Sequence, residues 1–295
     1  FFKPNWDSIL NGKVWVAAYS QIFFSLSIGF AIMVTYSSYL GKKSDITNNA
    51  FITGFANSGF ELLAGIGVFS ILGFMAMQQG VAVDEVVSGG VGLAFVVFPQ
   101  IINQLPALNG FFGFLFFGSL VLAGMTSLIS IVETYICGVQ EKFNISRTKS
   151  VLYGGGLAAI ISIIFSSNGG LYFLDVIDYF INNFGVALAG LVEVIAVAWV
   201  ARQLGKLQEH ANEISDIKLG IWWKICLGVI TPVVLGIMMF DNLRTNILEN
   251  YEGYATWFVT AYGWAVVVAV IIVGIVFGLI KNKTPQATGA KEVSQ

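Results

Sequence analysis

Seven long apolar stretches constrain what this chain can fold into. A helix needs about 20 mostly apolar residues to cross roughly 30 Å of hydrocarbon. In lipid, backbone N–H and C=O groups must find partners inside the protein, which favours helices. We therefore expect an all-α integral membrane protein with seven transmembrane helices. The stretches cover approximately residues 14–40, 50–78, 110–140, 149–166, 173–203, 219–240 and 255–280.

Composition agrees with lipid as the solvent of most side chains. Of the 295 residues, 56% are hydrophobic and 11% are charged, whereas a soluble domain carries about 25% charged residues. The net charge of −2 gives no indication of nucleic-acid binding. The two cysteines, Cys137 and Cys226, have no metal-ligand spacing, and we expect no structural disulfide between them. The single histidine, His210, is expected in a solvated polar loop.

The distribution of Lys and Arg predicts the orientation of the chain. Cytoplasmic loops of membrane proteins carry an excess of basic residues. If residues 1–13 form an extracellular loop, the outer side keeps Lys3, Lys13 and Arg244, and the other 12 of the 15 basic residues lie inside. We expect a multi-pass protein of the cell membrane with its first residues outside and a cytoplasmic tail at 281–295. The segment 83–106 is interrupted by Gly89, Gly90 and Pro99, and we expect a structured outer loop with short helices there.

The residues of the first apolar stretch indicate an interruption of its helix. Gln21 and Ser25 share a helical face, and Ser27, Ile28 and Gly29 follow at mid-membrane. Gly and Ser stabilise helix interiors poorly. One interpretation is a discontinuous helix whose open ends present dipoles and carbonyls to a substrate and an ion. The alternative is a kink that serves helix packing.

The segment GKVWVAAYSQIFFSLSIGFAIMVTYSSY resembles the sixth transmembrane helix of the neurotransmitter:sodium symporter family, and is most similar to bacterial members of the leucine-transporter type. The later segments follow in the matching order, so the resemblance covers helices six to twelve. It implies the second inverted repeat at 14–203 and two further helices at 204–280. Helices one to five of the same protein are missing, and we expect the chain to be the C-terminal part of a longer polypeptide.

The resemblance implies site residues in the first stretch. Phe24 corresponds to an aromatic lid over the substrate, Ser27 to a contact at the break, and Phe30 to a pocket wall. Ser25 corresponds to a ligand of a first sodium ion, where relatives often have threonine; the serine keeps an oxygen that suits a hard cation. Two further matches lie on this stretch: Gln21 near the ion site and Tyr39 at a cytoplasmic gate.

The second and third stretches carry further expected ligands. Asn57 and Glu61 are four residues apart and share a helical face. By resemblance, Asn57 contributes to the first sodium site, and the Glu61 carboxylate replaces a chloride ion or accepts a proton. The alternative for Glu61 is a structural hydrogen bond between helices. The third stretch has a row of small and hydroxyl-bearing residues, which by resemblance provides the second sodium site and a wall of the substrate pocket: Ala123, Thr126 and Ser127 for sodium, and Ile131 for substrate.

Acidic residues in the third and fifth stretches complete the expected gates. By resemblance, Asp178 is an outer-gate acid and Glu141 is a cytoplasmic-gate acid, where relatives usually have Asp. Asp175, one turn before Asp178, is expected to be a solvated rim residue. Glu193 is expected to be structural or proton-linked, and Glu133 has no assigned role.

The resemblance implies transport rather than enzymatic activity. We expect sodium-coupled, chloride-independent symport of a neutral, hydrophobic or aromatic amino acid by alternating access, with two sodium sites that are each only partly present in this chain. The expected partners are the amino acid, sodium ions, the bilayer and the missing helices. A seven-helix receptor and a non-transporting amino-acid sensor are the alternatives.

Overall fold

The computed structural model describes residues 6–10, 12–83, 92–105 and 107–281, and the described residues are helical with short connections. Six of the described helices are long and apolar enough to cross a membrane. They agree with the expected stretches from the second to the seventh and confirm an all-α membrane architecture. The spans run over Ile46–Gln79, Asn109–Phe143, Arg147–Phe165, Gly170–Val200, Ile221–Gly253 and Thr256–Leu279.

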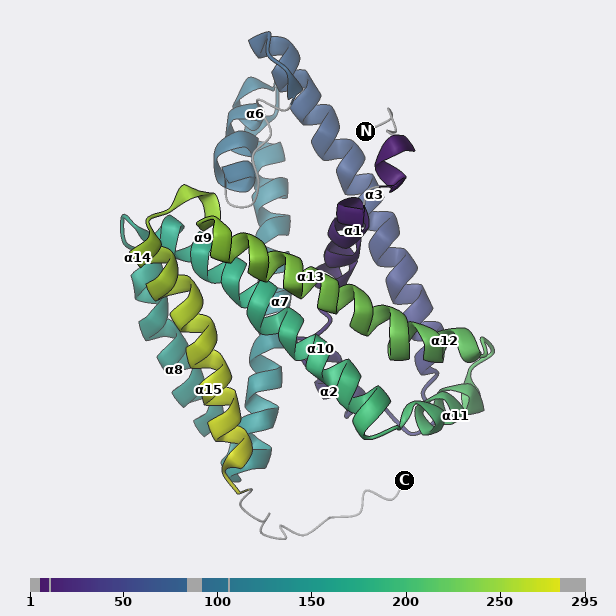
Figure 1. The fold of residues 1–295 in the computed structure, drawn as a ribbon. Coiled ribbons are helices and arrows are strands. Elements are labelled where there is room, and N and C mark those ends of the chain that lie inside the picture. The colour runs from purple at the N-terminus through teal and green to yellow at the C-terminus, as the bar shows by residue number, and fades with distance from the viewer. Residues whose placement is uncertain (1–5, 11, 84–91, 106, 282–295) are drawn as a thin grey trace. The chain divides into compact units, whose positions relative to one another are not determined.

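The first expected span is carried by two shorter helices instead of one long one. Helix α1 covers Gly12–Ser25 and helix α2 covers Ile32–Ser37, and Figure 1 draws them as separate coils. The predicted interruption is therefore confirmed. A total of seven membrane crossings stays a prediction, because neither piece is long enough to cross alone.

The chain divides into two compact units, and each is described by itself. The first unit comprises residues up to Ala17 and Asn49–Ile129. It contains the 3₁₀ helix η1 (Trp6–Leu10), most of α3 (Ile46–Gln79), the π-helical segment η2 (Leu93–Val97), α6 (Phe98–Gln104) and the first part of α7 (Asn109–Phe143). The described part of the expected outer loop thus consists of short helices.

A small apolar core holds the first unit together. Leu72 and Met75 of α3 are buried against Val97 and Ile101 of the short helices. The ring of Phe98 stacks on that of Phe116 of α7 at a centroid distance of 4.4 Å. The short helices of the outer loop are therefore packed on both long helices of this unit.

The second unit comprises Ala18–Asn48 and the chain from Ser130 onward. After the end of α7 it contains α8 (Arg147–Phe165) and three composite spans, with the short helix α11 (Leu204–Ile214) between the first two. His210 lies on α11, so the expected polar loop is partly helical; its side chain is exposed, as expected. The composite spans are α9–η3–α10–η4 (Gly170–Phe180, Ile181–Val186, Ala187–Ile195, Ala196–Val200), α12–η5–α13 (Ile221–Ile225, Cys226–Ile230, Thr231–Leu248) and α14–η7–α15 (Thr256–Phe258, Val259–Trp264, Ala265–Leu279).

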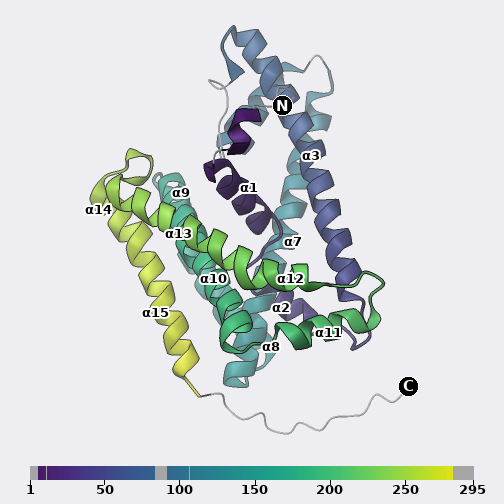
Figure 2. The ribbon, with the colours of Figure 1, turned by 45° about the vertical axis from the view of Figure 1, so that its right-hand side comes forward.

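The three composite spans pack on one another. Helix α13 lies along α10 in both ribbon views (Figures 1 and 2), and α9 contacts the π-helical segment η7. Their core is aromatic: Phe180 is fully buried, and Phe184 and Trp264 lie against each other at 4.7 Å. A Cβ on Gly263 would lie 2.7 Å from the Phe180 ring, so a glycine is required there for the close approach.

Pro232 of α13 directly follows the π-helical turn η5 in the second composite span. Proline has no N–H, so the carbonyl of Gly228, four residues earlier, loses its helical donor. The indole nitrogen of Trp199 donates to that carbonyl at 2.8 Å. The irregular turn is therefore satisfied from the neighbouring span, as the absence of water in a bilayer demands.

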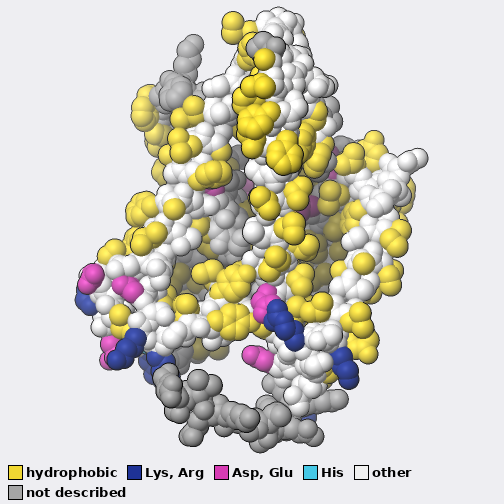
Figure 3. All heavy atoms as spheres, turned by 180° about the vertical axis from the view of Figure 1, so that it is seen from behind, with side chains coloured by type: hydrophobic (Ala, Val, Ile, Leu, Met, Phe, Trp, Pro, Cys, Tyr) yellow, Lys and Arg dark blue, Asp and Glu magenta, His cyan; other side chains and the backbone are white. Residues whose placement is uncertain are grey.

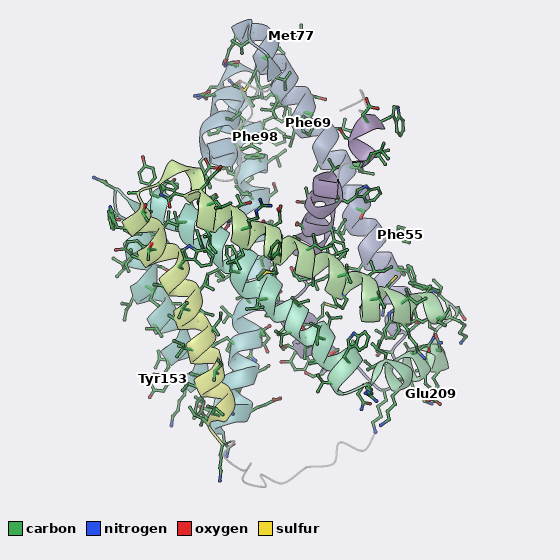
Figure 4. The ribbon with its side chains drawn as sticks, viewed as in Figure 1. Phe55, Phe69, Met77, Phe98, Tyr153 and Glu209 are labelled. Carbon is green, nitrogen blue, oxygen red and sulfur yellow. The ribbon has the colours of Figure 1, made fainter. Side chains whose placement is uncertain are left out.

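The outer surfaces of the long helices are apolar. Phe55 on α3 is 74% exposed and Tyr153 on α8 is 65% exposed, and both point away from their helices in Figure 4. On the face shown in Figure 3, hydrophobic side chains cover the helices, and the Lys and Arg side chains of the second unit gather at one end. This pattern fits helices surrounded by lipid.

Candidate functional site

The break between α1 and α2 is built from three residues in the left-handed region of backbone conformation. Ser27 has φ 53°, Gly29 has φ 83° and Ala31 has φ 57°. For Ser and Ala this conformation is strained and marks a structurally imposed turn. The predicted Ser27–Ile28–Gly29 step is therefore the point at which the helix stops.

The main chain is only partly satisfied by helical bonds at this point. The N–H of Ile28 donates to the Phe23 carbonyl and that of Ser27 to the Phe24 carbonyl, both at 3.0 Å. A helix leaves its last carbonyls and its first N–H groups without intrahelical partners. These helix ends carry partial charges that attract ions of opposite sign. The break can thus offer carbonyl oxygens to a cation and N–H groups to an anion.

The other side of the break packs closely on the span that begins with α9. A Cβ on Gly190 would lie 2.7 Å from Cζ of Phe23, and a Cβ on Gly29 would lie 3.0 Å from the Val186 carbonyl oxygen. Phe23 itself is only 2% exposed. This contact was not predicted, although the glycine Gly190 inside an apolar stretch was a signal for close packing.

A cavity of about 360 Å³ adjoins the break on this side. Its wall includes Ser27 and Gly29 of the break, Glu193 of α10, and Thr231 and Leu235 of α13. Most of the wall is apolar, and Glu193 brings one carboxylate to it. The structure thus gives Glu193 a place beside the break, which its position in the sequence did not indicate.

The expected substrate residues occupy three elements. Phe24 lies near the end of α1, Ser27 and Phe30 lie in the break, and Ile131 lies on α7, where it is 50% exposed. Phe24 packs edge-on against Phe23 at 5.9 Å. A common substrate pocket of these four residues stays a prediction.

The expected ligands of the first sodium ion fall in different units. Ser25 is the last residue of α1, in the second unit, and Gln21 lies one turn earlier and is exposed. Asn57 is on α3 in the first unit, where its amide nitrogen donates to the Glu61 carboxylate at 3.1 Å. An amide that donates through its nitrogen still has an oxygen of the type that binds hard cations, so a role of Asn57 as a sodium ligand stays a prediction.

The expected second sodium site lies on one exposed turn of α7. The Thr126 hydroxyl donates to the Ala123 carbonyl at 2.9 Å, and Ser127 is the next residue. Two expected oxygen ligands are therefore brought together within the first unit. A donating hydroxyl keeps lone pairs that can bind a hard cation.

The expected cytoplasmic-gate residue Tyr39 contacts a polar cluster on α7 and α8. Its hydroxyl donates to Glu133 at 2.8 Å and lies 2.7 Å from Cys137 Sγ. Arg147 binds the same carboxylate with two nitrogen atoms, at 2.8 and 2.6 Å. Glu141, two turns further along α7, is exposed.

The sequence alone assigned no role to Glu133, which lies at the centre of this polar cluster. Its side chain is 14% exposed, so its charge requires a partner. The available signal was the spacing of Glu133, Cys137 and Glu141, which places all three on one face of α7. The arginine that pairs with it lies on the following helix and could not be assigned from spacing.

The two acids of α9 have different surroundings. Asp175 accepts hydrogen bonds from the hydroxyls of Tyr251 at 3.2 Å and Tyr254 at 3.0 Å. The expectation of a solvated Asp175 is therefore wrong, because the chain after α13 folds back over this carboxylate. Burial and the bond to Asp175 raise the pKa of Tyr254 to about 12, so this hydroxyl remains a donor at neutral pH.

The expected outer-gate acid, Asp178, is exposed and bonds within its own span. The amide nitrogen of Asn182, one turn later, donates to Asp178 Oδ1 at 2.9 Å. An exposed carboxylate with one amide donor can still bind a cationic side chain through its remaining lone pairs.

Comparisons with known proteins give one consistent result. The model of the sodium:neurotransmitter symporter family matches residues 1–284. An uncharacterised sodium-dependent transporter of Methanocaldococcus jannaschii is 41% identical over 282 residues, which are 96% of this chain and 57% of that protein. The human sodium- and chloride-dependent neutral and basic amino acid transporter B(0+) is 29% identical over 95% of the chain and 44% of its own length. The human sodium- and chloride-dependent creatine transporter 1 is 32% identical over 90% of the chain and 43% of its own length. The chain spans about half the length of these relatives.

Proposed function

Because the chain belongs to the sodium:neurotransmitter symporter family, we propose that it forms the C-terminal part of a sodium-coupled transporter of neutral amino acids. The observation that supports the proposal is the break at Ser27–Ala31, which separates α1 from α2 within the first apolar stretch. Family members named in the comparisons are transporters, which argues against the alternative of a seven-helix receptor.

The substrate is a neutral amino acid with a hydrophobic or aromatic side chain. Helix ends at the break offer N–H groups for a carboxylate and carbonyls for an ammonium group. Phe24, Phe30 and Ile131 supply apolar surface for the side chain. The name of the B(0+) relative includes neutral amino acids, whereas other relatives are named for creatine, glycine and dopamine, so substrate class varies within the family.

Two sodium ions drive the transport. The first is bound by Ser25 and Asn57 and the second by Ala123, Thr126 and Ser127, in each case together with groups from helices outside this chain. All of these ligands are neutral oxygens, which suit a monovalent hard cation. Ion and substrate binding are coupled because both favour the same conformational state.

Glu61 makes the cycle independent of chloride. Its carboxylate lies one turn from Asn57 and is hydrogen-bonded to it, so it supplies a fixed negative charge beside the first sodium site. Phe24 and Asp178 close the outside, and Tyr39, with Glu141, closes the inside. The first residues of the chain lie outside the cell and the last ones in the cytoplasm.

Uptake by the full-length protein in proteoliposomes tests the proposal. Radiolabelled leucine, phenylalanine, alanine and glycine would be supplied with an inward sodium gradient. We expect uptake of at least one of them, and none without sodium. Asn57→Ala and Ser127→Ala should each raise the sodium concentration for half-maximal uptake about 10-fold or more, as expected for loss of one ligand.

Ser162→Ala is the matched control, because the Ser162 hydroxyl bonds to the Ala158 carbonyl of its own helix, away from the expected ligands. Equal uptake without sodium would refute the coupling. Saturable sodium-dependent binding without uptake would favour the sensor. Glu61→Ser should make uptake depend on chloride, and a variant that works equally well in gluconate would refute the charge-replacement role.

A further inference from the structure

Asp175 and Asp178 lie three residues apart on α9, yet only one of them is available to a cationic partner. Asp175 is committed to Tyr251 and Tyr254, which lie beyond the end of α13. Asp178 is exposed and is held by Asn182 of its own span. The difference between the two acids therefore depends on the residues that follow them.

Asn182 lies at the start of a π-helical turn. The segment Ile181–Val186 is wound as a π-helix, directly after α9. Such turns interrupt α-helices mostly where a function requires a side chain to be re-aimed. Here the amide of Asn182 is directed back to Asp178 Oδ1 at 2.9 Å.

Asn183, the next residue, makes a different set of bonds. Its amide nitrogen donates to the Tyr179 carbonyl at 2.9 Å, and its amide oxygen accepts from Asn242 of α13 at 3.0 Å. One turn along α13, Asn246 is 7% exposed and donates to the Tyr179 hydroxyl at 2.9 Å. The Asn183–Asn242 bond attaches the π-helical turn to α13, and the Asn246–Tyr179 bond attaches the end of α9 to it.

We propose that Asn182 is a positioning residue that holds the Asp178 carboxylate ready for a cationic group at the outer gate, on a turn that the Asn183–Asn242 bond attaches to α13. The proposal rests on the proposed function, in which Asp178 is the outer-gate acid. A neutral amide orients a carboxylate without removing its charge. Oδ2 and the second lone pair of Oδ1 can then accept a bidentate pair of hydrogen bonds from a guanidinium group. The two neighbouring asparagines thus have different roles: Asn182 orients the Asp178 carboxylate, and Asn183 connects its span to α13.

The test compares the two asparagines in the full-length transporter. Sodium-driven uptake in proteoliposomes would be measured with the best substrate among leucine, phenylalanine, alanine and glycine, together with the melting temperature. Asn182→Ala should raise KM about 3- to 10-fold, as expected for one lost hydrogen bond, with the melting temperature unchanged. Asn182→Gln, which keeps the amide donor, should recover part of the loss. Asn183→Ala should lower the melting temperature and raise KM less than Asn182→Ala does, because the Asn182–Asp178 bond remains possible.

A double-mutant cycle tests separately whether Asp178 acts at the outer gate and whether Asn182 positions its carboxylate. Asp178→Asn should impair uptake strongly, and Asn182→Ala should add nothing to it, because their effects pass through the same carboxylate. Additive effects, or an unchanged KM in Asn182→Ala while Asp178→Asn is impaired, would overturn the positioning role alone. Normal uptake by Asp178→Asn would overturn the gate itself, and the positioning role with it.

Discussion

Polar side chains are used differently in the two units. In the first unit, the expected ion ligands make hydrogen bonds along their own helices, from Asn57 to Glu61 and from Thr126 to Ala123. In the second unit, polar side chains join separate elements, as in the pairs Arg147–Glu133 and Asn183–Asn242. The printed hydrogen bonds of the second unit connect its helices to one another, and we predict that the expected ion ligands of the first unit matter more for sodium binding than for stability. Thermal unfolding and uptake of the full-length protein test this comparison.

The largest effect on stability is expected from Arg147→Met. The variant leaves the Glu133 carboxylate without its bidentate partner in a site that is 14% exposed, and breaking such a pair from one side costs more than removing it entirely. We expect the melting temperature to fall by roughly 5 °C or more, in line with the loss of a major interaction. The double variant Glu133→Gln with Arg147→Met should recover most of the loss. A single variant that melts as the parent does would show that this pair is not structural.

Gly154→Ala should have the next largest effect. A Cβ on Gly154 would overlap the ring of Tyr135 on α7, so either this ring or the two helices must shift. Overpacking of this kind costs about 1–3 kcal/mol. Gly155→Ala is the matched control, because a Cβ there meets nothing within 4 Å. Equal melting temperatures for the two variants would contradict the close packing.

A smaller effect is expected from Trp199→Phe, which removes the indole donor of the Gly228 carbonyl. A buried backbone carbonyl without a hydrogen-bond donor costs about 1–3 kcal/mol of folding free energy. We expect a cost near the lower end of this range, because Trp199 is 60% exposed. In a Pro232→Ala background the chain regains an N–H four residues after Gly228, so Trp199→Phe should cost less there. If the cost is the same in both backgrounds, the indole is not replacing the helical donor.

Thr126→Val should change stability least, by about 0.5 kcal/mol or less, because the hydroxyl is exposed and bonds within its own turn. It should nevertheless raise the sodium requirement of uptake strongly, whereas Thr126→Ser should not. A variant that loses stability but keeps its sodium dependence would reverse the comparison between the units.

Hydropathy and local chemistry were sufficient to predict six spans and the interruption of the first one. A helix must be long and apolar to cross the bilayer, so spans can be found from the sequence. The Ser27–Ile28–Gly29 step is locally unfavourable for a helix. The partners of Asp175 and Glu133 could not be predicted in this way. Tyr251 and Tyr254 reach Asp175 only because the chain folds back after α13, and Arg147 pairs with Glu133 only because α8 turns back beside α7.

The π-helical turns were not predicted either, because they are set by contacts between spans. A proline such as Pro232 interrupts the hydrogen bonds of a helix. The residue that donates to the Gly228 carbonyl in its place is Trp199, which is 33 positions before Pro232 and belongs to another span. Asn182 and Asn183 are chemically identical in the sequence, and only the neighbouring helix distinguishes them.

The near-contact between Gly29 and the Val186 carbonyl links two irregular segments that are far apart in the sequence. Gly29 lies in the break of the first helix, and Val186 ends the π-helical turn that begins just after Asp178. A Cβ on Gly29 would crowd both the carbonyl oxygen and a side-chain methyl group of Val186. We therefore expect a larger side chain at Gly29 to displace this π-helical turn, which directly follows the helix that carries Asp178.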